Sequence, residues 1–94
     1  MINTKHAKIR FKERTDFASK DMNKICKLAI KNGLSFKQLP KGNLKKYLSV
    51  RNHKRIKIYQ GFIFFFFKTS NRLITIYPIP EQFLEEYKKI LKSS

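Results

Sequence analysis

The spacing of apolar residues changes midway along the chain, from a helical repeat to a strand repeat. In residues 4–14, Ala7 and Phe11 lie four positions apart and share one helix face. In residues 19–32, apolar side chains recur at intervals of three and four, at Met22, Ile25, Cys26 and Ala29. The pattern therefore predicts helices over residues 4–14 and 19–32, and a short third helix that Asn43 caps.

The second part of the chain has the pattern of strands. Basic and apolar residues alternate in residues 55–59, as in a half-buried strand. Residues 62–68 form a nearly continuous apolar run, and residues 72–77 are rich in β-branched side chains. Because only short polar connections separate these three segments, they predict an antiparallel meander.

This order of elements predicts an α+β fold in a single domain that spans residues 1–94. Pro78 and Pro80 end the last strand, and the apolar spacing in residues 81–91 predicts a closing C-terminal helix. We expect the N-terminal helices to pack on one face of a three-stranded antiparallel sheet, with a four-stranded sheet as the alternative. The other face is then expected to carry a site or to contact a partner subunit.

The chain is strongly basic, and the charge is concentrated in its first part. Lys and Arg number 22 against 6 Asp and Glu, which gives a formal net charge of +16. Residues 1–57 hold 17 of these basic residues and 3 of the acidic ones. A field of this strength attracts polyanions, so nucleic acid or nucleotide phosphate is the expected partner. The alternative is a basic surface that serves only solubility.

Composition argues against several other classes of protein and site. Cys26 is the only cysteine, which excludes an internal disulfide and a cysteine-based zinc finger, and its apolar neighbours predict a small core residue. The acidic residues do not cluster and the glycines are isolated, so we expect no metal and no cofactor. The longest apolar run has six residues, so no membrane partner is expected. No signal peptide is visible, and a cytoplasmic location is expected.

The first predicted helix carries the candidates for catalysis. His6 and Arg10 lie one turn apart, and Arg14 lies roughly 80° around the helix from His6 at 100° per residue. An imidazole can transfer a proton near neutral pH, and guanidinium groups can hold a phosphate. His6, Arg10 and Arg14 are therefore the predicted catalytic residues for phosphodiester chemistry. The alternative is an amphipathic helix with Arg–Glu pairs.

A second group of residues is expected to contact phosphates or bases. The basic segment 51–55 can reach phosphates, or it can be a solvated loop. Tyr59 and Tyr77 lie near strand ends, where tyrosine can stack on a base, although such residues more often complete the edge of a core. The predicted phosphate- and nucleotide-binding residues are Lys5, Lys45, Lys46, Arg51, His53, Lys54, Arg55, Tyr59, Thr75 and Tyr77.

Two segments resemble a known group of proteins. Residues 4–14, T-K-H-A-K-I-R-F-K-E-R, resemble the T-x-H-A-x-x-R-x-x-E-R opening of small bacterial and phage proteins that look like relatives of the RelE- and BrnT-like toxins. Residues 73–80, L-I-T-I-Y-P-I-P, resemble the ending of small phage proteins. The resemblance implies the barnase–EndoU–colicin–RelE superfamily, an α+β fold in which many members are metal-independent ribonucleases. It also implies His6, Arg10, Arg14 and either Thr75 or Tyr77 as site residues.

Two functions follow from the residues and the resemblance. The first is a metal-independent phosphodiesterase that acts on RNA, with His6 as general acid or base. The second is a phage-type anti-defence protein that sequesters or cleaves a cyclic nucleotide, in the host cytoplasm if the gene is phage-encoded. A pocket shared between subunits would enclose such a small ligand, so this alternative favours a homo-oligomer. A third reading is an accessory protein that binds nucleic acid only weakly.

Overall fold

The fold is α+β, as the order of the predicted elements indicated. The computed structural model describes residues 5–50 and 55–93, apart from the side chains of His6, Ser19 and Ser93. Within these residues the elements are α1 (Lys5–Arg14), η1 (Ser19–Asp21), α2 (Met22–Asn32), β1 (Leu34–Ser35), η2 (Phe36–Gln38), α3 (Asn43–Ser49), β2 (Arg55–Tyr59), β3 (Phe62–Phe66), β4 (Leu73–Pro78), η3 (Glu81–Phe83) and α4 (Leu84–Ser93). None of the helices in this part of the chain is long and apolar enough to cross a bilayer.

The strands form an antiparallel sheet in the order β1-β2-β3-β4. The three predicted strands are confirmed within two residues at each end, and the protein adopts the four-stranded alternative. Its additional strand, β1, pairs with β2 and places Leu34 opposite Ile58. Because β1 has only two residues, it shows no alternating pattern in the sequence. Gln60 and Gly61 join β2 to β3 with φ angles of 54° and 80°, as a tight hairpin turn requires.

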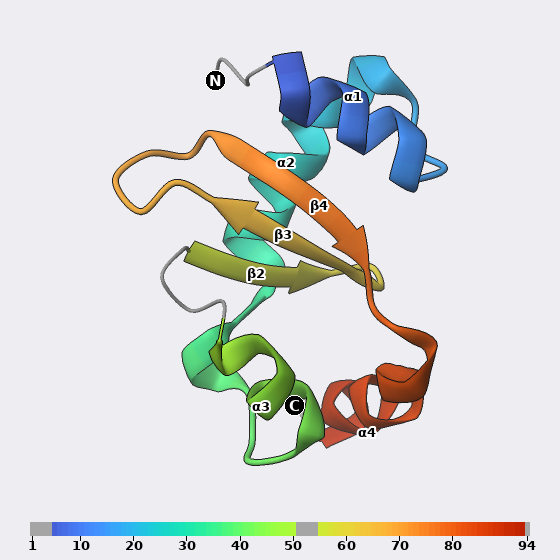
Figure 1. Cartoon of the computed structure of the whole chain (residues 1–94), viewed down its shortest axis with the longest axis vertical. Coiled ribbons are helices and arrows are strands. Elements are labelled where there is room, and N and C mark those ends of the chain that lie inside the picture. Colours follow the sequence, from blue (N-terminus) through green and yellow to red (C-terminus); the bar gives the residue numbers. More distant parts are fainter. Residues whose placement is uncertain (1–4, 51–54, 94) are drawn as a thin grey trace.

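Helices cover both faces of the sheet, which corrects the expectation that they cover one. α1 and α2 lie above and behind the strands, whereas α3 and α4 lie below them (Figure 1). Phe64 and Phe66 of β3 pack with Phe11 in a core on the α1/α2 face. Ile63 and Phe65 of the same strand belong to a second core with α3 and α4. Since β3 is apolar on both of its sides, each face of the sheet has to be buried.

The edge strand β4 contains a β-bulge that sets the direction of its last side chains. Thr75 lies opposite Phe65, whereas Leu73 lies opposite Phe66, so Ile74 is an extra residue in β4. The bulge shifts the alternation of side chains along the strand. The polar side chain that follows it therefore shares the α3/α4 face with Phe65.

A residue of α4 caps the N-terminus of α3, which corrects the expected role of Asn43. Gly42 occupies the N-cap position and offers no side-chain hydrogen bond. The Glu86 carboxylate instead accepts a hydrogen bond from the Leu44 N–H at 2.9 Å. A negative charge is favourable at this end of a helix because the free N–H groups carry partial positive charge. The bond holds α4 against the start of α3.

Candidate functional site

Arg14, the last residue of α1, reaches across the free edge of the sheet. α1 packs along β4, and its Ala7 and Phe11 side chains are fully buried in the core of the α1/α2 face. From the end of this helix, Arg14 Nη1 donates hydrogen bonds to Thr75 Oγ1 at 3.2 Å and to the Ile76 carbonyl oxygen at 3.1 Å. Because Thr75 belongs to the α3/α4 face, the guanidinium lies where the two faces meet.

The Ile76 carbonyl group is available to Arg14 because of its position in the strand pairing. The Ile79 N–H donates to the Gly61 carbonyl oxygen at 3.0 Å, just beyond the last paired residues. Hydrogen-bonded and non-hydrogen-bonded pairs alternate in an antiparallel ladder, so Phe64 and Ile76 form a non-hydrogen-bonded pair. The Ile76 carbonyl therefore points away from β3, toward the free edge. Arg14 supplies a donor there and also fastens α1 to the sheet.

The Arg14 guanidinium also stacks on an aromatic ring. Its Cζ atom lies 4.1 Å from the centroid of the Tyr77 ring, which is a cation–π contact. Both hydrogen bonds described above use Nη1. The Nε–Nη2 edge of a guanidinium can hold a phosphate through two parallel hydrogen bonds. The bonds to Thr75 and Ile76 do not use this edge, so it can turn toward a ligand.

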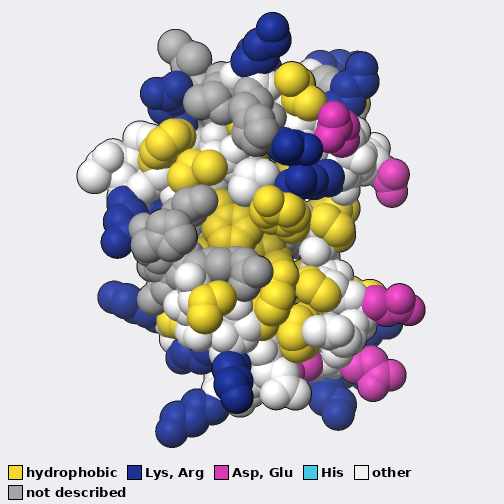
Figure 2. Space-filling model, viewed as in Figure 1, with side chains coloured by type: hydrophobic (Ala, Val, Ile, Leu, Met, Phe, Trp, Pro, Cys, Tyr) yellow, Lys and Arg dark blue, Asp and Glu magenta, His cyan; other side chains and the backbone are white. Residues whose placement is uncertain are grey.

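Tyr77 presents an accessible ring beside this charge. It is 44% exposed, and its ring meets Phe65 edge-on at a centroid distance of 5.9 Å. Hydrogen bonding by the Arg14 side chain lowers the pKa of the Tyr77 phenol from its ordinary value of 10.0; partial burial opposes this, and Thr75 and Arg10 reinforce it. In the view of Figure 2, hydrophobic side chains cover the middle of the molecular surface, and Lys and Arg side chains lie directly above them. An exposed ring beside fixed positive charge suits a base and its phosphate.

Arg10 and His6 belong to the same flank of α1 as Arg14. At 100° per residue, the three positions span roughly 80° around the helix. Arg10 Nη1 lies 3.4 Å from Glu13 Oε2 in an ion pair at the surface, and the charge of Arg10 adds to the lowered pKa of Tyr77. The His6 backbone is part of α1, but its side chain lies outside the described residues.

The other predicted binding residues that the structure describes do not join this cluster. In the strand pairing, Arg55 lies opposite Phe66, at the end of β3 that is remote from Tyr77. Its guanidinium donates hydrogen bonds to Ser70 and Asn71 in the loop between β3 and β4. Tyr59 packs against the core of the α1/α2 face. Lys45 donates to the Leu39 carbonyl oxygen at 3.0 Å, and the neighbouring Lys46 is exposed on α3. Three predicted residues lie outside the described part of the chain: Arg51, His53 and Lys54.

A lysine-rich groove on the other flank of α1 was mostly missed by sequence analysis. This groove, which we name the lysine groove, has a volume of about 550 Å³ and lies between α1 and the segment formed by η1 and α2. Its lining includes Lys5, Lys8, Ile9, Lys12, Lys20 and Met22, of which only Lys5 was predicted to bind. The spacing of the three lysines in α1 was a visible signal. The approach of Lys20 was not visible, because it depends on how η1 packs against α1.

Cys26 is a core residue rather than a nucleophile. It is fully buried on the α1/α2 face, as its apolar neighbours predicted. Burial raises the pKa of its thiol to about 12, so the reactive thiolate is scarce at neutral pH. Across residues 5–50 and 55–93, no three His, Cys, Asp or Glu side chains gather as metal ligands would.

Arg14, Thr75 and Tyr77 combine an oriented guanidinium, a hydroxyl group and an accessible ring at one edge of the sheet. The fold brings these predicted site residues together from opposite ends of the chain. Such a set can hold a phosphodiester while a base stacks nearby. Comparison of the chain with protein families, with curated proteins and with solved structures gave no match.

Proposed function

We propose that this protein binds RNA phosphodiesters at the β4 edge of its sheet, through Arg14, Arg10 and Tyr77. The observation that carries the proposal is the Arg14 guanidinium, which the Thr75 hydroxyl and the Ile76 carbonyl hold in place at 3.2 and 3.1 Å. A guanidinium that is already oriented loses less side-chain freedom when a ligand binds. Its Nε–Nη2 edge matches two oxygen atoms of a phosphate.

The neighbouring side chains suit the rest of a nucleotide. Tyr77 offers an exposed aromatic surface on which a base can stack without regard to its sequence. Arg10 adds a second positive charge on the same flank of α1. The resemblance of residues 4–14 to the opening of RelE- and BrnT-like proteins also supports a ligand of this class.

Cleavage of the bound RNA without a metal ion is a second candidate function, and the place of His6 in α1 favours it. In such a reaction, the 2′-hydroxyl attacks the adjacent phosphorus and the P–O5′ bond breaks, which leaves a 2′,3′-cyclic phosphate and a free 5′-hydroxyl. One group has to take the 2′ proton, and another has to give a proton to the leaving oxygen. His6 is the candidate for proton transfer, and Arg14 is the candidate for holding the charged phosphorane.

The binding proposal is tested by the affinity for a short single-stranded RNA in low salt. Arg14→Ala should weaken binding by roughly 10- to 100-fold, the loss of a charged hydrogen-bonded contact. Arg14→Lys should restore only part of the affinity, because an ammonium group cannot form the two-pronged contact. Tyr77→Ala should weaken binding, whereas Tyr77→Phe keeps the ring and should bind nearly as well as the wild type.

The matched control is Arg72→Ala, which removes the same charge just before β4, beyond the end of the strand that is far from Tyr77. If Arg72→Ala weakens binding as much as Arg14→Ala does, the ligand responds to overall charge and the proposed site is wrong. Chromatography of the recovered RNA separates the two candidate functions. Intact RNA indicates binding alone, whereas 2′,3′-cyclic phosphate ends indicate cleavage, which His6→Ala should then slow by ~10²–10⁴.

A further inference from the structure

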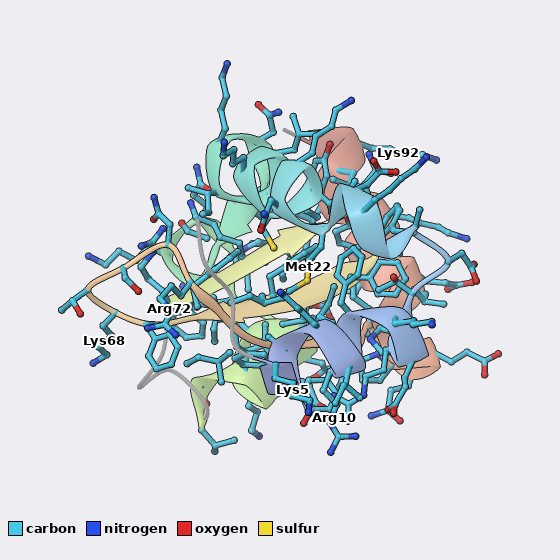
Figure 3. All side chains as sticks on the ribbon, turned by 90° about the horizontal axis from the view of Figure 1, so that it is seen from above. Lys5, Arg10, Met22, Lys68, Arg72 and Lys92 are labelled. Carbon is cyan, nitrogen blue, oxygen red and sulfur yellow. The ribbon has the colours of Figure 1, made fainter. Side chains whose placement is uncertain are left out.

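The lysine groove and the Arg14 cluster lie on opposite flanks of α1. Lys8 and Arg10 are two positions apart in the helix, which places them roughly 160° apart around its axis at 100° per residue. The buried Ala7 and Phe11 side chains lie between the two flanks, on the side of α1 that faces the sheet. Figure 3 shows Arg10 extending from the side of α1 that faces away from Met22, a residue of the groove.

The lysine groove concentrates like charges that have no partner within the described residues. Lys8 and Lys12 are four positions apart, a spacing at which like charges destabilise a helix, and Lys20 approaches from η1. No hydrogen bond or ion pair links these three lysines to another described residue. Beside them, Ile9 is 45% exposed. A chain of phosphates would relieve the repulsion, and Ile9 offers an apolar surface for a sugar or a base.

We infer that the ligand is a single-stranded RNA of several nucleotides, which runs from the Arg14 cluster over the outside of α1 into the lysine groove. The inference rests on the proposed function. A helix with its side chains is about 10–12 Å across, so a ligand that touches both flanks has to span at least this distance. A cyclic dinucleotide held by Arg14 would leave the groove empty, whereas an extended strand carries phosphates to both places.

The experiment compares two uncleavable probes. The long probe is a 2′-O-methyl RNA of about 12 nucleotides, a length within the range of single-strand binding sites. The short probe is a 2′-O-methyl dinucleotide. The affinity of each is measured over a range of salt concentrations. The test variant carries Lys8→Gln, Lys12→Gln and Lys20→Gln. The control variant carries Lys41→Gln, Lys88→Gln and Lys92→Gln, which remove the same charge from exposed lysines near α3 and in α4. Since the test variant removes like-charge repulsion, we expect it to fold.

For the long probe, the test variant should lower the slope of log affinity against log salt by about 2, as expected when three phosphate contacts to a single strand are lost. The control variant should leave that slope nearly unchanged. Neither variant should alter the slope for the dinucleotide. The inference is overturned if the two variants affect the long probe equally, or if the long probe binds no tighter than the dinucleotide.

Binding of the dinucleotide separates failure of this inference from failure of the proposed function. If Arg14→Ala weakens dinucleotide binding while the groove variant leaves the long probe unaffected, the Arg14 site stands and the path over α1 is wrong. If neither probe binds in low salt, both proposals fail.

Discussion

Arg14 serves the fold through one nitrogen atom and offers the other edge of its guanidinium to the candidate site. Nη1 satisfies the Ile76 carbonyl and the Thr75 hydroxyl, and neither of these bonds uses the Nε–Nη2 edge. Loss of the side chain would therefore affect both the docking of α1 and the candidate site. Arg14→Lys separates the role of the charge from that of the planar guanidinium, because it keeps the first and loses the second.

The acidity of Tyr77 is a direct measure of its contact with Arg14. We expect the Tyr77 phenol to titrate below 10.0, because the Arg14 side chain favours the phenolate. The stability that this interaction adds is fully present above pH 10 and is lost as the pH falls through the lowered pKa. The measurement is the ultraviolet absorbance of phenolate against pH, as the difference between the wild type and Tyr77→Phe.

Two variants separate the causes of this shift. Arg14→Ala should raise the pKa of Tyr77 toward its ordinary value, whereas Arg72→Ala should leave it unchanged. A difference titration centred at or above pH 10 in the wild type would show that the guanidinium does not contact the phenol in solution.

At the scale of elements, periodicity was sufficient to predict the main helices and strands. It could not predict β1, whose two residues are defined only by pairing with β2. It placed α1 and α2 on one face correctly but did not place α3 and α4 on the other, although the apolar run in β3 shows that both faces need cover. The cap on α3 was unpredictable because Glu86 comes from a helix that follows the sheet.

The candidate site was partly predictable for a different reason. His6, Arg10 and Arg14 share a flank by helical spacing alone, but their approach to β4 depends on how α1 packs. The bulge at Ile74 determines that Thr75 shares a face with Phe65, and the local sequence gives no sign of this bulge. Thr75 and Tyr77 were named as site residues from strand position and resemblance, not from a predicted contact with Arg14.

The central strand gives a stability prediction with an internal control. Phe64 is fully buried on the α1/α2 face, whereas Phe67, just beyond the end of β3, is 39% exposed. Phe64→Ala should lower the free energy of unfolding by about 3–5 kcal/mol, the cost of removing a buried phenyl group. Phe67→Ala should cost less than half as much. Equilibrium denaturation in urea measures both values. Equal losses would contradict the assignment of β3 and the burial of Phe64 on the α1/α2 face.

At the scale of the whole molecule, a net charge of +16 on 94 residues means that folding brings like charges together. Raising sodium chloride from about 0.01 to 0.3 M shortens the screening length from about 30 Å to well under 10 Å. We therefore expect the thermal unfolding midpoint to rise over this range. The variant with Gln at positions 8, 12 and 20 should show a smaller rise. A midpoint that falls or stays constant with salt would mean that self-repulsion does not limit stability.

The two outer strands of the sheet also bear on how separate copies of the chain meet. Long, flat outer strands recruit strands from other molecules and can start aggregation. Here β1 has two residues, and β4 has a bulge, a neighbouring helix, and a guanidinium on its outward Ile76 carbonyl. These features leave little backbone for an incoming strand. Crowded copies of the protein should therefore resist fibril-like stacking through these two strands.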